Sequence, residues 1–125
     1  MKLNPDCCRA VLLAVEEKSL GEIYTLPQLV EKLETYTTDD ITYSCLKLSE
    51  AGFLDIATAT PLLNQYSPTI TTIYDITYQG HIFLEKVRND NIWEETKSKT
   101  RKVGAFALDI LAQVAGNIIT SKLGF

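Results

Sequence analysis

Apolar side chains recur at helical spacing through the first 50 residues of the chain. A first helix begins at Asn4 and Pro5 and is stopped by Gly21. A second helix, capped by Thr25, follows a short extended piece at residues 23–24, and a third covers residues 39–52. Their predicted buried faces are Cys7, Val11, Ala14 and Val15 in the first, Leu26, Leu29, Val30 and Leu33 in the second, and Ile41, Cys45 and Leu48 in the third.

Beyond Gly52 the hydrophobic period falls to two. The stretches "FLDIATAT" and "TITTIYDI" alternate and predict two strands joined by the loop "PLLNQYSP", and Thr77 then caps a fourth helix. Helix, short strand, helix, helix, strand, loop, strand, helix is the order of a winged helix-turn-helix domain, in which the hairpin loop is the wing. The sequence therefore predicts an α+β, mostly helical fold with a winged-helix domain in residues 1–90.

The rest of the chain predicts a polar linker over residues 91–102 and an added amphipathic helix over residues 103–125. Trp93, the single tryptophan, is expected to anchor the linker onto the body. The last helix has one narrow polar stripe, and its wide apolar face must lie against something. Its own domain or a second copy, a groove of a target protein, and a membrane surface all remain open. The residues expected to mediate self-association are Phe106, Leu108, Leu111, Ala112, Ala115, Ile118 and Ile119.

Charge divides the chain into an acidic body and a basic tail. Up to Thr96 there are 7 basic and 15 acidic residues, a balance of −8, and from Lys97 onward 5 and 1, a balance of +4. The outward face of the third helix carries three acids and one base, and residues 48–85, 38 in all, contain neither lysine nor arginine. Since affinity for DNA comes largely from contacts between cations and phosphates, this pattern favours a protein partner. DNA binding remains the alternative, with the cations supplied by the tail.

Each hypothesis has its own candidate residues. The protein-contact hypothesis names residues of the third helix and the wing: Tyr43, Lys47, Glu50, Asn64, Gln65 and Tyr66. The DNA hypothesis names cations that would lie on phosphate: Lys47, Lys97, Lys99, Arg101 and Lys102. The basic cluster of the tail also precedes the apolar run as a juxtamembrane cluster does, so membrane-surface association is a third hypothesis.

No catalytic, cofactor or metal site is expected. His81 is the single histidine, and the three cysteines, Cys7, Cys8 and Cys45, lack the spacing of a zinc site. Neither a phosphate-binding P-loop nor a dinucleotide-binding glycine motif is present. An odd set of cysteines and an N-terminus without a signal-peptide pattern predict a cytoplasmic protein.

Several short segments resemble a family of bacterial and prophage proteins whose function is not known. They are Met1 to Asn4 with Asp6 and Arg9, Gly52 to Leu54, Ile76 and Thr77, Gly80 and His81, Phe83 and Leu84, Trp93, Gly104, Phe106, and Leu108 to Leu111. The resemblance spans nearly the whole chain and implies a winged-helix fold and a phage or mobile-element setting. It implies no activity and no catalytic residues. We therefore expect a non-enzymatic interaction module that binds another protein and associates with itself through the last helix.

Overall fold

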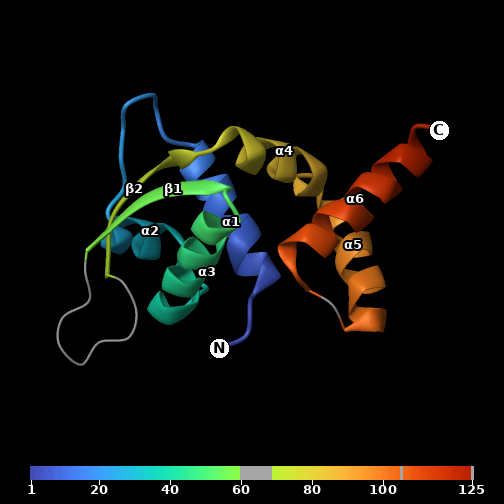
Figure 1. Ribbon diagram of the computed structural model, residues 1–125, viewed down its shortest axis with the longest axis horizontal. Coiled ribbons are helices and arrows are strands. Elements are labelled where there is room, and N and C mark those ends of the chain that lie inside the picture. Colours follow the sequence, from blue (N-terminus) through green and yellow to red (C-terminus); the bar gives the residue numbers. More distant parts are fainter. Residues whose placement is uncertain (60–68, 105, 125) are drawn as a thin grey trace.

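The computed structural model describes residues 1–59, 69–104 and 106–124, and these form six helices and one two-stranded antiparallel sheet. The layout is α+β and mostly helical, as the sequence predicts, and it is consistent with a winged-helix arrangement (Figure 1). In chain order the elements are α1 (Pro5–Glu16), α2 (Leu26–Lys32), α3 (Thr38–Glu50), β1 (Leu54–Ala59), β2 (Thr69–Ile76), α4 (Tyr78–Val87), α5 (Asp90–Val103) and α6 (Leu108–Lys122).

The first helices begin where the sequence places their caps. Asn4 accepts a hydrogen bond from the backbone N–H of Cys7, and Thr25 forms a reciprocal capping box with Gln28. Thr37 and Thr77 cap α3 and α4 in the same way. The end of α1 differs from the prediction, because the helix stops at Glu16. Gly21, in the left-handed region at φ +83°, belongs to the turn that follows.

The sheet is the predicted hairpin, and one isolated bridge adds to it. Leu54 of β1 lies opposite Ile76 of β2, and the ladder runs to the pair Ala59 and Thr69 with two register shifts. Tyr24 forms an isolated bridge to Ile73 on the other side of β2, with N···O distances of 3.0 and 2.8 Å. This bridge confirms the extended piece predicted at residues 23–24. The wing candidates Asn64, Gln65 and Tyr66 lie outside the described residues.

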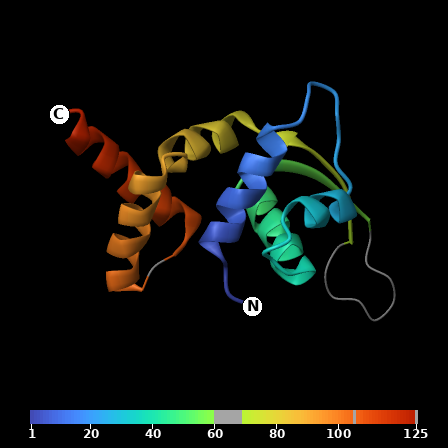
Figure 2. The same cartoon turned by 180° about the vertical axis from the view of Figure 1, so that it is seen from behind.

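The core forms around α1, which packs against α3, α4 and β2 (Figures 1 and 2). The α3 side chains at Ile41, Cys45 and Leu48 are fully buried there, as predicted from their spacing. Ile73 of β2 and Leu84 of α4 are fully buried in the same core. One face of α3 is thus fixed in the core, and its opposite face is left for contacts elsewhere.

Residues 90–103 form a helix, α5, where the sequence predicts a polar linker over 91–102. Asn89 caps its start, and Gly104 ends it in the left-handed conformation at φ +68°. The buried side chains Trp93, Thr96 and Thr100 share one face, which packs toward the body. Both threonines donate their hydroxyls to backbone carbonyls one turn earlier, so they are buried without losing a hydrogen bond. Trp93 is 2% exposed, which confirms its predicted role as an anchor.

The last helix therefore begins at Leu108 instead of residue 103. It packs against α5 and α4, and its buried residues Leu108, Leu111 and Ala115 join the core of the same chain. Of the surfaces considered from the sequence, its own domain covers the greater part of its apolar face. Among the helices in the described ranges, none combines the length and the apolar character needed to cross a membrane.

Candidate partner-binding groove

The outward face of α3 carries Tyr43, Lys47 and Glu50 at spacings of four and three residues. The opposite face, with Ile41 and Leu48, is buried in the core, so these three side chains must point away from it. The structure thus brings together the three α3 candidates for partner contact that the sequence identifies.

This face forms one wall of a groove of about 350 Å³, which we call the α3–α6 groove. The other walls come from the N-terminal segment and from the start of α6. Its lining residues are Leu3, Tyr43, Lys47, Glu50, Ala51, Ala107, Leu108 and Asp109. Three of these residues are charged. The other five are uncharged, namely the two leucines, the two alanines and the tyrosine.

The charges of the groove leave it acidic. Lys47 Nζ lies 2.8 Å from a carboxylate oxygen of Glu50 and 5.2 Å from the centre of the Tyr43 ring. The hydrogen bond to Glu50 raises the pKa of Lys47, so the lysine stays charged and paired with a partner of its own chain. Asp109 is the remaining charge, and the groove has one negative charge in excess.

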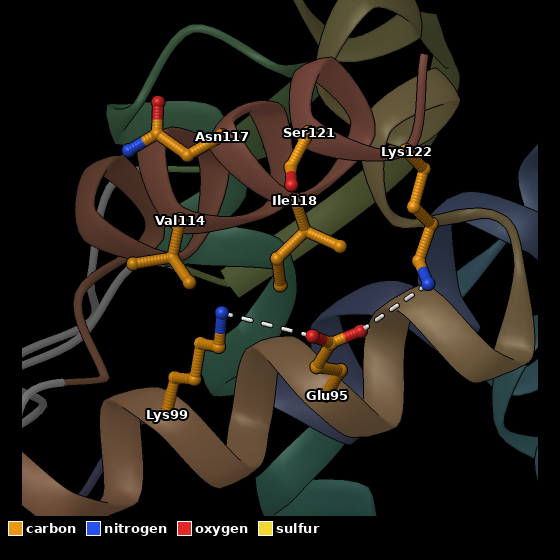
Figure 3. A pocket seen from close by; sticks show the side chains of 7 residues that line it. All are labelled: Glu95, Lys99, Val114, Asn117, Ile118, Ser121 and Lys122. Atoms are coloured by element: carbon orange, nitrogen blue, oxygen red, sulfur yellow. Dashed lines mark ion pairs between the residues drawn. The ribbon is translucent and has the colours of Figure 1, made fainter. Parts of the chain in front are cut away.

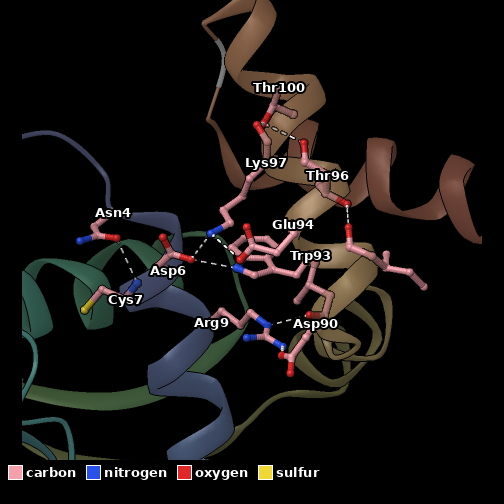
Figure 4. A network of polar contacts seen from close by, with 12 residues as sticks. Asn4, Asp6, Cys7, Arg9, Asp90, Trp93, Glu94, Thr96, Lys97 and Thr100 are labelled. Carbon is pink, nitrogen blue, oxygen red and sulfur yellow. Dashed lines mark hydrogen bonds and ion pairs between the residues drawn. The ribbon is translucent and has the colours of Figure 1, made fainter.

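The tail cations proposed for phosphate contacts divide into two groups. Lys97 Nζ lies 2.7 Å from Asp6 and 3.2 Å from Glu94, and its side chain is only 11% exposed (Figure 4). Lys99 pairs with Glu95 at 3.6 Å. By contrast, Arg101 and Lys102 are exposed and make no ion pair with any residue that the structure describes.

Lys97 belongs to a network that fixes α5 on α1. Asp6 accepts hydrogen bonds from Lys97 Nζ and from Trp93 Nε1, the latter at 2.9 Å (Figure 4). Arg9 stacks over the Trp93 ring and donates to Asp90 and to the last carbonyls of α4. Burial alone would raise the pKa of the Asp6 carboxyl, but the hydrogen bonds from Lys97 and Trp93, helped by the charges of Lys97 and Arg9, lower it. These cations have a structural role that the sequence does not reveal.

The face predicted for self-association is largely occupied within the chain. Leu108, Leu111, Ala115 and Ile118 are buried, and Phe106, Ala112 and Ile119 are half-buried. Because α4 and α5 of the same molecule cover the buried members, they are not available to a second copy. Among the residues that the structure describes, the large apolar side chains exposed near this helix are Ile110 on α6, Leu123 at its end and Val103 at the end of α5.

A second hollow, of about 310 Å³, lies between α5 and α6 (Figure 3). Glu95 stands between two lysines, with Lys99 at 3.6 Å and Lys122 at 3.8 Å, and Val114 and Ile118 form an apolar wall on α6. Only the pair with Lys122 joins α5 to α6, and since both lysine side chains are more than half exposed, each ion pair contributes little. The hollow marks the seam of the α5–α6 hairpin.

The three cysteines are buried, and their surroundings favour the protonated thiol. Cys7, Cys8 and Cys45 are fully buried free thiols, and burial raises the pKa of all three, to about 12 for Cys45. His81 is exposed on α4. Within the described ranges, no group of three or more His, Cys, Asp or Glu side chains is placed to hold a metal ion.

Several lining residues of the groove were not among the sequence candidates. Leu3, Ala51 and Ala107 come from three separate segments, and their small or apolar side chains carry no signal of a binding role. Asp109 does carry a signal, because it starts the polar stripe of the last helix and so had to face away from the core. Leu108, which the sequence predicts for self-association, also lines this groove.

Comparison with known proteins identifies the family of the chain. A family model described as "Hypothetical protein (DUF2513)" matches residues 2–106. A protein of Haemophilus influenzae (strain ATCC 51907 / DSM 11121 / KW20 / Rd), described as an uncharacterized protein, is 31% identical over 124 residues, covering 98% of this chain and 99% of the relative. No solved structure matches. The chain therefore belongs to the family of hypothetical proteins DUF2513.

Proposed function

We propose that this chain is a non-enzymatic, cytoplasmic interaction module with a winged-helix fold, and that it binds another protein through the α3–α6 groove. The observation that carries the proposal is the groove itself. It lies on the face of α3 that a winged-helix domain presents to its target, it is largely apolar, and it is acidic. The phage or prophage setting implied by the family resemblance is part of the same proposal.

The charges on this face oppose DNA as the target. A phosphate approaching α3 would meet Glu50 and Asp109, and Lys47, the one cation in the groove, is already paired. Cation–phosphate contacts supply most of the non-specific attraction for DNA. Of the tail cations proposed to replace them, Lys97 and Lys99 are paired within α5 or to α1.

The chemistry of the groove defines the partner it fits. An apolar side chain of the partner would cover Leu3 and Ala107. A lysine or arginine next to it would form an ion pair with Asp109 and compete with Lys47 for the carboxylate of Glu50. The partner is thus a protein segment in which a basic residue stands next to an apolar one.

DNA binding remains the second candidate because Arg101 and Lys102 are exposed and have no ion-pair partner among the described residues. They stand at the end of α5, outside the groove. Binding through them alone would be weak, would fall steeply with salt, and would be lost in Arg101→Gln with Lys102→Gln.

A photo-crosslinking amino acid in place of Tyr43 tests the proposal. Tyr78, which is 72% exposed at the start of α4, is the matched control position. In the native host, position 43 should yield a discrete protein adduct that position 78 does not, and Glu50→Lys in the same chain should abolish it. Circular dichroism of the purified variants checks that the fold is kept. Equal crosslinking from both positions, or none from position 43, contradicts the proposal.

Fluorescence anisotropy with labelled duplex DNA at low salt tests the second candidate, DNA binding.

A further inference from the structure

The end of α5 is an exposed basic and apolar segment. It consists of Arg101, Lys102 and Val103, which we call the α5 end. Val103 is 75% exposed, among the most exposed large apolar side chains described. The two cations beside it make no ion pair with a described residue, whereas Lys97 and Lys99, one turn earlier, both do. The segment therefore offers a binding surface of its own.

The α5 end has the composition that the α3–α6 groove requires. It places a valine next to two cations, and the groove has apolar walls at Leu3 and Ala107 with carboxylates at Glu50 and Asp109. The charge balance is +2 on the segment and −1 in the groove. Opposite charges of this kind steer two surfaces together and fix their register.

The two surfaces do not meet within one chain. Val103 would be covered if the α5 end occupied the groove of its own molecule, and it is exposed. A two-fold axis that brings the α5 end of one copy to the groove of the other also brings the second α5 end to the first groove.

We propose that the groove binds the α5 end of a second copy of this chain, in a two-fold dimer held by two identical contacts. A two-fold arrangement satisfies both surfaces of each copy and closes the assembly, whereas a head-to-tail contact would leave a free groove and a free α5 end. This inference rests on the proposed function, because it names the protein that occupies the groove. It differs from association through the apolar face of α6, which is covered within the chain.

Charge exchange between the two surfaces tests this dimer on the full chain. Sedimentation velocity should show a concentration-dependent dimer that added salt dissociates. The groove variant (Glu50→Lys with Asp109→Lys) and the α5 variant (Arg101→Glu with Lys102→Glu) should each raise the dissociation constant by about a hundredfold, because like charges then face each other. An equimolar mixture of the two variants should restore the dimer, since both of its contacts again join opposite charges.

A matched control changes the same kind of charge elsewhere. Glu31→Lys with Glu34→Lys alters two exposed acids on and after α2 that belong to neither surface, and should leave dimerisation unchanged. A wild-type monomer at every concentration, a dimer that survives both charge variants, or a mixture that stays monomeric overturns the inference.

The crosslinker at position 43 separates this inference from the proposed function. An adduct of twice the mass of the chain supports both. If wild type is monomeric but position 43 crosslinks a different protein, the groove binds a partner and the inference of a second copy is wrong. If no adduct forms and the chain is monomeric, both are wrong.

Discussion

Gly80, in the first turn of α4, packs against Phe53 in the connection between α3 and β1 and against Ile76 at the end of β2. A Cβ atom at this position would stand 2.1 Å from the backbone oxygen of Phe53 and 2.6 Å from a methyl group of Ile76. A backbone carbonyl cannot move aside as a flexible side chain can, so Gly80→Ala should lower the free energy of unfolding by about 2 kcal/mol. Urea denaturation of the two proteins measures this difference.

Gly116 provides the control for that substitution. It also lies within a helix, but the nearest atom to its added Cβ is the end of the Lys86 side chain at 3.9 Å. Gly116→Ala should therefore raise the stability by about 0.5–1 kcal/mol, through the lower entropy of the unfolded chain. Equal effects from the two substitutions would show that the close approach at Gly80 has no energetic weight.

Asp6 makes the stability of the molecule depend on pH. Its pKa in the folded protein is below the ordinary value of 3.8, so the carboxylate stabilises the fold above that value. This contribution is lost as the pH falls through the lower, folded-state pKa. Asp6→Asn should cost about 1–2 kcal/mol at neutral pH, less than a buried charge pair would, because the side chain is 47% exposed.

The difference between wild type and Asp6→Asn should therefore be constant above about pH 5 and shrink below 3.8. Urea denaturation across this range measures it. Glu94→Gln is the control, since Glu94 contacts the same lysine but is 72% exposed, and its effect should be smaller. A difference that grows toward acid pH would contradict the lowered pKa of Asp6.

At the level of elements, the sequence predicts the helices and strands whose buried faces consist of apolar side chains. The helix caps at Asn4, Thr25 and Thr77 and both strands are found as expected. The sequence predicts a linker in place of α5 because the buried face of this helix consists of one tryptophan and two threonines, which do not form an apolar stripe. The threonine hydroxyls bond to the helix backbone, a compensation that becomes visible only in three dimensions.

The placement of α6 gives adjacent residues opposite environments. Leu111 is fully buried against the body, whereas Ile110 is 36% exposed. Leu111→Ala leaves a cavity in the core and should lower the free energy of unfolding by about 3 kcal/mol, while Ile110→Ala should cost less than about 1 kcal/mol. Urea denaturation at two protein concentrations measures both. If α6 were instead the dimer interface, the cost of Leu111→Ala would depend on protein concentration.

At the level of the whole molecule, the groove could not be found from the sequence. Its walls come from the N-terminal segment, α3 and the start of α6, and the hydrophobic pattern of each segment alone does not show that the three meet. The outward face of α3 was predictable because helical geometry fixes which side faces the core. Its acidic character was also predictable, since charge is a property of composition, but the pairing of Lys97 with Asp6 was not.

The buried contact between α5 and α1 predicts that the helical hairpin and the body unfold together. Trp93 is the single tryptophan and lies at that contact, so its fluorescence reports the docking of α5, while far-ultraviolet circular dichroism reports helices throughout the chain. The core joins residues of α1, α4, α5 and α6 in one cluster. Urea transitions from the two probes should therefore coincide in wild type and shift by the same amount in Asp6→Asn. A fluorescence transition at lower urea would mean that α5 and α6 detach first, as a unit separate from the rest of the chain.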